Sequence, residues 1–136
     1  MNIDKFKQQH IEIIGCVTAL RQRARDGISE NAAEISKLIF SMSSIIKLHL
    51  TVEDTILYPA LQSGNNSALA IMGKRFQDEM CGIASAYLEF ARTWNNADKV
   101  SRNPEGFRSE ANKVLKILHD RMKKENTDFY PAIEAL

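Results

Sequence analysis

Residues 53–61, EDTILYPAL, return in part at residues 125–133, which read ENTDFYPAI. The two segments share Glu, Thr, Tyr, Pro and Ala at the same positions, and both end in an aliphatic residue. The proline in each segment predicts the end of a helix, because its ring clashes with the preceding turn. The repeat is too short for a stacked repeat array. It predicts instead that two helices deliver the same side chains, Glu53 and Glu125 among them, to one level of the fold.

Each copy of the repeat follows a stretch with the apolar spacing of an amphipathic helix. Apolar side chains recur every three or four positions in residues 31–59 and again in residues 104–129. Residues 4–25 and 69–94 show the same spacing, and strand signals are nearly absent. Polar or glycine-containing segments typical of loops separate these stretches: residues 26–27, 63–67 and 95–103.

Four amphipathic helices joined by short loops bury their apolar stripes most simply as a bundle. We therefore predict an all-α fold, an up-down-up-down four-helix bundle. A chain of 136 residues has the size of one ordinary domain, so we expect a single domain over residues 1–136. In this topology, the starts of the first and third helices and the ends of the second and fourth lie together at one end of the bundle.

The composition is that of an ordinary globular domain, with 44% apolar and 26% charged residues, which excludes disordered and fibrous classes. With 18 basic and 17 acidic side chains the net charge is +1, so we expect neither nucleic acid nor an anionic membrane as a partner. The first residues contain no apolar targeting segment, and no run approaches the ~20 apolar residues that cross a bilayer. We expect a cytoplasmic protein.

The chain has three histidines, His10, His49 and His119, and each lies on or beside a predicted inward stripe. At ~1.5 Å per residue their heights above the shared end of the bundle are about 9, 15 and 18 Å, so they can meet. His49 and Glu53 are four residues apart and project from one helix face. A buried glutamate is costly unless its charge is paired or bound to a metal. We therefore predict a metal site formed by His10, His49, Glu53, His119 and Glu125.

Three motifs extend this prediction: QH at residues 9–10, HLTVED at residues 49–54 with LYP after it, and His119 followed by YP at residues 130–131. With these motifs nearly the whole chain resembles the hemerythrin family, including its bacterial HHE cation-binding domains. The resemblance implies the same bundle and a non-haem di-iron centre that binds dioxygen or senses oxygen, nitric oxide or peroxide. It also implies that His10 and His49 hold one iron, that Glu53 bridges, and that His119 serves the other iron.

The third helix departs from the family's pattern. The family supplies one or two histidines from this helix, but here Phe76 and Met80 stand at the corresponding height. A phenyl ring has no lone pair, and a thioether is a poor ligand for ferrous or ferric iron. The second iron therefore has no ligand from this helix.

The fourth helix departs as well. The family's carboxylate follows its histidine by four or five residues, where this chain has Lys123 and Lys124. Alignment on the internal repeat puts Arg121 opposite His49 and leaves His119 two residues, about 200°, out of phase. A bulge in this helix would restore the phase of His119.

These departures predict a hemerythrin-like metal-binding protein with a reduced site that holds one iron, or another divalent ion, in place of a full di-iron centre. Oxygen, nitric oxide or redox sensing, or metal handling, follows from the resemblance, with dioxygen or another diatomic molecule as ligand. The alternative is a metal-free bundle that works in signalling or protein interaction, with a buried lysine in place of the ion's charge. The sequence contains neither a glycine-rich phosphate loop nor a nucleophile elbow, so neither motif favours an enzyme. A protein partner or a homodimer is left open.

Overall fold

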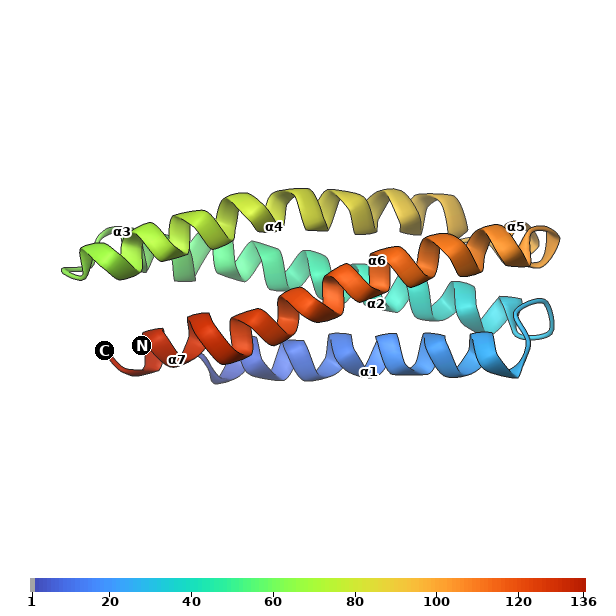
Figure 1. The fold of residues 1–136 in the computed structure, drawn as a ribbon, viewed down its shortest axis with the longest axis horizontal. Helices are drawn as coiled ribbons and strands as arrows, with labels where there is room; N and C mark the ends of the chain where they lie inside the picture. Colours follow the sequence, from blue (N-terminus) through green and yellow to red (C-terminus); the bar gives the residue numbers. More distant parts are fainter. Residues whose placement is uncertain (1) are drawn as a thin grey trace.

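The computed structural model describes residues 2–136. It is a bundle of four long helical rods that alternate in direction (Figure 1). The rods are α1 (Asp4–Asp26), then α2 (Ala32–Val52) continued by η1 (Glu53–Leu57) and α3 (Tyr58–Gln62), then α4 (Ser67–Trp94), then α6 (Pro104–Lys124) continued by η2 (Glu125–Phe129) and α7 (Tyr130–Glu134). One short helix, α5 (Ala97–Arg102), connects the third and fourth rods. No strand is present in the described residues, and the predicted all-α, up-down-up-down bundle is confirmed.

Each copy of the internal repeat contains one π-helical turn, η1 or η2, followed by a proline. The sequence predicts that the second helix ends near Pro59, but the rod continues to Gln62. The Tyr58 N–H bonds to the carbonyl of Glu53, five residues back, and Pro59 follows at the start of α3. The wider turn relieves the clash that a proline makes inside a regular helix, so the chain passes through Pro59 without stopping.

Residues 95–103, expected as a loop, contain α5 and two helix caps. The Asn96 side chain accepts hydrogen bonds from the backbone N–H groups of Asp98 and Lys99 and so starts α5. The Asn103 side chain accepts from the N–H of Gly106 at 3.1 Å and so starts α6. Local capping by asparagine therefore organises a polar segment that shows little apolar spacing.

Replacing Asn103 with alanine is expected to lower the free energy of unfolding by about 1 kcal/mol, because α6 loses the acceptor for one of its first N–H groups. Urea unfolding followed by circular dichroism measures the change. Metal content should stay the same, because Asn103 lies at the start of α6 and the candidate site lies at its other end. An unchanged unfolding midpoint would contradict the capping role.

Two apolar clusters form the core, and a layer of buried polar side chains separates them. On α1, Phe6 belongs to the cluster at the end with the C-terminus, His10 to the polar layer, and Ile13 to the larger cluster (Figure 1). The same order recurs on the other two rods that supply the polar layer. That layer contains six side chains that are at most 4% exposed: Gln9, His10, His49, Glu53, Arg121 and Glu125. Apolar packing on both sides thus shields these polar groups from water.

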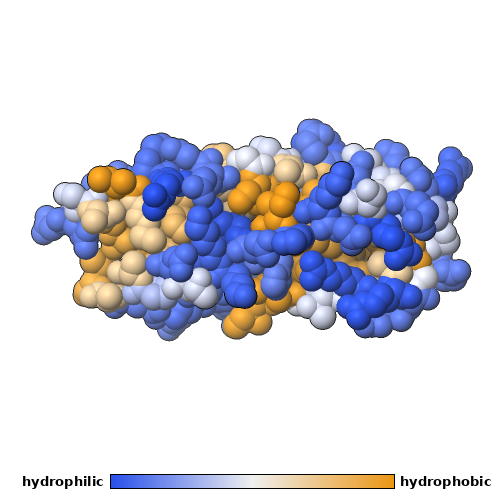
Figure 2. Space-filling view, in the orientation of Figure 1, coloured by the Kyte–Doolittle hydropathy of each residue, from blue (hydrophilic) through white to orange (hydrophobic). Residues whose placement is uncertain are grey.

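The second rod, from Ala32 to Gln62, is long and apolar enough to cross a membrane by length and composition alone. Its inward residues, among them Ile39 and Ile46, are fully buried against the other rods, and its outer face exposes Phe40 and Leu48. Figure 2 shows one face of the molecule, where apolar side chains lie in separate groups among hydrophilic ones. The core helix of a bundle can meet the same criteria of length and composition, so this rod is weak evidence for a membrane span.

Candidate metal centre

The structure brings together four of the five side chains predicted as metal ligands, and we call this group the His–Glu cluster: His10, His49, Glu53 and Glu125. Each offers one ligand atom, and these atoms all lie within 4.8 Å of one another. The Nε2 atoms of His10 and His49 are 3.1 Å apart, and Glu125 Oε1 is 3.0 Å from His10 Nε2 and 4.0 Å from His49 Nε2. Glu53 Oε1 contacts His49 Nε2. The first, second and fourth rods therefore converge on one point, with His10 from α1, His49 and Glu53 from α2 and η1, and Glu125 from η2.

Two amide side chains orient the histidine rings of the cluster. His49 Nδ1 donates to Gln9 Oε1 at 2.7 Å, and His10 Nδ1 donates to Asn126 Oδ1 at 2.8 Å. Amide oxygens only accept hydrogen bonds, so Nδ1 carries the proton in both rings. In the neutral rings, each Nε2 then points a lone pair toward the centre of the cluster. Outer hydrogen bonds of this kind fix the tautomer of metal-binding histidines.

The charges of the cluster show that its centre suits a cation. Burial lowers the pKa of His49, but the hydrogen bonds with Glu125 and Glu53 overcome this effect and raise that pKa to about 9. Burial raises the pKa of Glu125, but the hydrogen bonds with His10 and His49 lower it to about 2. While both Nε2 atoms are unprotonated, Glu125 Oε1 has no hydrogen-bond donor within residues 2–136. A positive charge between the two rings and the carboxylates, a proton or a metal ion, satisfies this arrangement.

The two tyrosines of the internal repeat also lie against the cluster. Tyr58 Oη donates to Glu53 Oε2 at 2.5 Å, and Tyr130 Oη is 3.0 Å from His10 Nε2 and 3.4 Å from Glu53 Oε1. Burial, together with the nearby carboxylates, raises the pKa of both phenols well above its ordinary value, so both remain protonated. The tyrosines therefore act as neutral hydrogen-bonding groups at the edge of the cluster.

Arg121 lies four residues before Glu125, the same distance at which His49 precedes Glu53. Its side chain is 2% exposed, and its Nε donates to Glu125 Oε2 at 3.3 Å. Its Nη1 donates to Glu79 at 3.2 Å, its Nη2 donates to the carbonyl of Phe76, and the guanidinium lies 4.4 Å from the centre of the Phe76 ring. The metal-free alternative requires a buried lysine beside Glu53 or Glu125, and the buried cation at this place is instead Arg121.

His119 lies outside the His–Glu cluster. Its side chain is half-buried, and Arg121, two residues later, takes the inward position at this level of α6. Two residues correspond to about 200° around a helix, so the two side chains point in nearly opposite directions. The π turn η2 begins at Glu125, after both residues, and therefore does not bring His119 back into phase.

Three residues of the site were not predicted as ligands but have recognisable sequence signals. Gln9 immediately precedes His10, and Asn126 immediately follows Glu125, so both lie beside a predicted ligand. Arg121 could have been recognised from the internal repeat, which aligns it with His49. In each case proximity to a ligand is visible in sequence, but the direction of the side chain depends on how the helices pack.

Comparison with models of known protein families matches residues 1–133 to the family described as the hemerythrin HHE cation binding domain. No curated protein and no solved structure matches the chain. The matched residues include all of the His–Glu cluster.

Proposed function

The chain belongs to the hemerythrin HHE cation-binding family, and from this premise we propose that it binds one iron ion at the His–Glu cluster and senses a diatomic molecule or the cellular redox state. Membership of the family and the buried histidine–glutamate cluster together fit metal binding. The single observation that carries the proposal is the orientation of two Nε2 lone pairs, held by Gln9 and Asn126, toward a carboxylate oxygen that lacks a donor.

The distances within the cluster fit ligands of one ion. Nitrogen and oxygen ligands lie about 2.0–2.2 Å from a bound transition-metal ion, so two ligands of one ion are about 3 to 4 Å apart. The separations of His10 Nε2 from His49 Nε2 and from Glu125 Oε1 are 3.1 and 3.0 Å, and that of His49 Nε2 from Glu125 Oε1 is 4.0 Å. These separations fit three ligands of one ion, and we propose Glu53, whose Oε1 contacts His49 Nε2, as the fourth.

The donor types favour iron among the available metals. Two imidazoles with carboxylates and no thiolate are typical of non-haem ferrous sites that keep open positions. Bound ferrous iron supplies an open coordination position for a diatomic molecule and electrons for redox chemistry. The protein holds the phenol of Tyr130 beside these ligands and packs apolar layers on both sides, which limits the access of water.

Arg121 supports a site for one ion rather than two. Alignment of the two copies of the repeat pairs His49 and Glu53 with Arg121 and Glu125. In the second copy, a guanidinium that cannot lose its proton holds Glu125 Oε2, and Phe76 packs beneath it. This fixed positive charge occupies the place of a second cation.

Metal content tests the proposal directly. Untagged protein reconstituted anaerobically with ferrous iron should contain one iron per chain by elemental mass spectrometry, and nitric oxide should change its ultraviolet-visible spectrum. Two irons per chain would contradict the role of Arg121. One iron without a response to nitric oxide or oxygen would favour metal handling over sensing.

The second candidate function is a metal-free module for signalling or protein interaction. One observation favours it: Arg121 already neutralises Glu125, and protonation of His49 satisfies the rest of the cluster. The same reconstitution decides between the candidates, because no bound iron after anaerobic loading would support the metal-free module.

Replacing Gln9 with leucine is expected to weaken iron binding about 10–100-fold, because His49 Nδ1 loses its acceptor and the ring is no longer held in the binding tautomer. Competition with a chromophoric chelator measures the affinity. Gln8 is exposed and adjacent, so Gln8→Leu is the matched control and should bind iron normally. Equal affinities for the two variants would show that Gln9 does not orient His49.

A further inference from the structure

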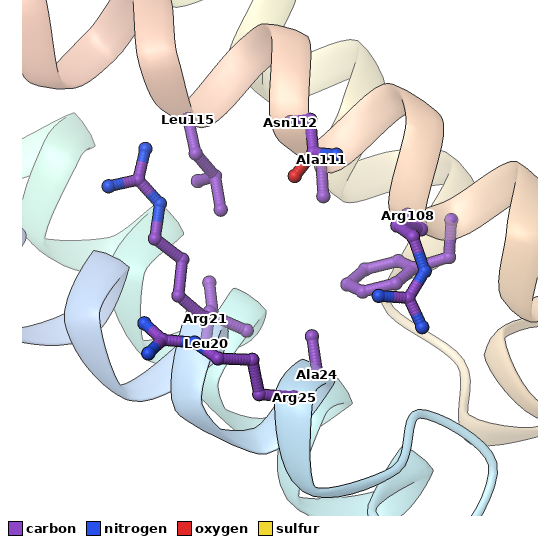
Figure 3. Close-up of a pocket in the computed structure, with 9 residues that line it drawn as sticks. Leu20, Arg21, Ala24, Arg25, Arg108, Ala111, Asn112 and Leu115 are labelled. Carbon is purple, nitrogen blue, oxygen red and sulfur yellow. The ribbon is translucent and has the colours of Figure 1, made fainter.

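A pocket lies between α1 and α6, in the part of the bundle away from the His–Glu cluster (Figure 3). Its volume is about 200 Å³, and none of the cluster residues lines it. Arg21, at its edge, lies about 16 Å along α1 from His10. The pocket is therefore separate from the candidate metal centre, and its properties can be considered on their own.

The floor of the pocket is apolar. Leu20, Phe107 and Leu115 line it and are at most 3% exposed. Ala24 and Ala111 face each other from the two helices and have no side chain beyond Cβ, so they leave the space between α1 and α6 unfilled. Interiors of proteins are otherwise packed with few voids. The floor thus offers an apolar surface of limited size to a bound molecule.

The rim of the pocket is positively charged. Arg21 and Arg108 lie on opposite sides of it, and Arg25 lies along its lower edge (Figure 3). Neither Arg21 nor Arg25 forms an ion pair within residues 2–136, and Arg108 Nε is 3.8 Å from the exposed carboxylate of Glu105. An exposed pair at that distance neutralises little charge.

Arg23, on the same helix, differs from these arginines because it forms ion pairs with acidic side chains. It lies between Arg21 and Arg25 in sequence but does not line the pocket. Its guanidinium is 3.0 Å from Glu34 and 3.6 Å from Asp26. The arginines that surround the apolar floor are therefore the ones that carry little or no compensating acid.

We propose that this pocket binds a small organic monocarboxylate. The apolar body of the ligand covers Leu20 and Phe107, and its carboxylate meets the guanidinium groups of the rim, whose planar donors match a carboxylate. The volume is below the ~300–1,000 Å³ of pockets for drug-sized ligands, so the body has about six to ten carbon atoms. Inorganic phosphate would leave the apolar floor uncovered, and a neutral hydrocarbon would not use the arginines.

Titration of the full chain with octanoate tests the proposal, by isothermal calorimetry at constant ionic strength. Octanoate should bind with a stoichiometry of one and at least about tenfold more tightly than acetate, which lacks the apolar body, or 1-octanol, which lacks the charge. Phosphate is the fourth probe. If acetate or phosphate bound as tightly as octanoate, the pocket would be a simple anion site and the proposal would be wrong.

Substitutions locate the binding in the pocket. Arg21→Gln and Arg108→Gln should each weaken octanoate binding about three- to tenfold, whereas Arg23→Gln, the matched control, should not change it. Ala111→Leu fills the pocket and should abolish binding, and Ala24→Leu serves the same purpose from α1 if that variant does not fold. Unchanged affinity in both arginine variants would overturn the proposal. His49→Ala should bind octanoate normally, so failure of this proposal and failure of the metal site are distinguishable.

Discussion

His49→Ala is expected to abolish stoichiometric iron binding, with a loss of affinity greater than about 100-fold. His49 Nε2 contacts Glu53 Oε1, lies 3.1 Å from His10 Nε2, and is held in the binding tautomer by Gln9. Loss of an outer partner alone costs about 10–100-fold in affinity, so loss of the ligand itself should cost more. Elemental mass spectrometry after anaerobic loading and desalting measures the bound iron.

His119→Ala is the matched control for this experiment. The resemblance to the family implies an iron ligand at His119, but the structure places that side chain outside the cluster, on the opposite side of α6 from Arg121. We expect this variant to retain one iron per chain. Full iron occupancy in His49→Ala, or loss of iron in His119→Ala, would show that the ligands are not those of the His–Glu cluster.

Arg121→Ala is expected to lower the free energy of unfolding by about 3–5 kcal/mol, the range for removal of one partner from a buried ion pair. In this variant the buried Glu125 loses one positively charged partner. The Phe76 carbonyl loses its hydrogen-bond donor, and the Phe76 ring loses its contact with the guanidinium. Urea unfolding of metal-free protein measures the effect without a contribution from a bound ion.

Lys124→Ala is the control for Arg121→Ala, because Lys124 approaches the same two partners from the surface. Its Nζ lies 3.8 Å from Glu79 and 5.3 Å from the centre of the Phe76 ring, but the side chain is half exposed. Exposed pairs contribute about 0–1 kcal/mol, so we expect little change. Similar losses for the two variants would mean that burial of Arg121 adds nothing to its ion pairs.

Periodicity and the internal repeat predicted much of this molecule. Apolar spacing at three and four residues indicated the helices and their inward faces, and the repeat indicated that Glu53 and Glu125 lie at one level. The structure places both glutamates beside His10 and His49 as expected. Such features depend on helix geometry, which is nearly the same in every bundle.

The structure differs from the predictions made from the sequence where a helix is not regular or where a charge is buried. The rod that contains Pro59 continues because a π turn precedes the proline, and hydrogen bonds five residues apart leave no clear signal in the spacing of apolar residues. The charge of Arg121 disfavours a buried position, so the sequence alone does not predict one. Its ion pairs with Glu125 and Glu79 compensate for the burial of this charge. His119, by contrast, is a good ligand by type but has the wrong phase. Both outcomes depend on neighbours from other helices.

The two π turns also define how the protein tolerates changes in length. Each turn holds one residue more than a regular helical turn, and this extra residue places Tyr58 under Glu53, and Tyr130 beside the cluster, at a spacing of five. Deletion of a single residue within 54–57 would convert η1 to a regular turn in which the Tyr58 N–H still bonds to the Glu53 carbonyl, now at a spacing of four, so α3 would keep its orientation relative to α2. Leu57 and Leu61 would then still face the apolar cluster at the end of the bundle with the C-terminus. Each π turn thus contains one inserted residue. An alignment of homologues that leaves out this insertion would pair the wrong aromatic residues with the metal ligands.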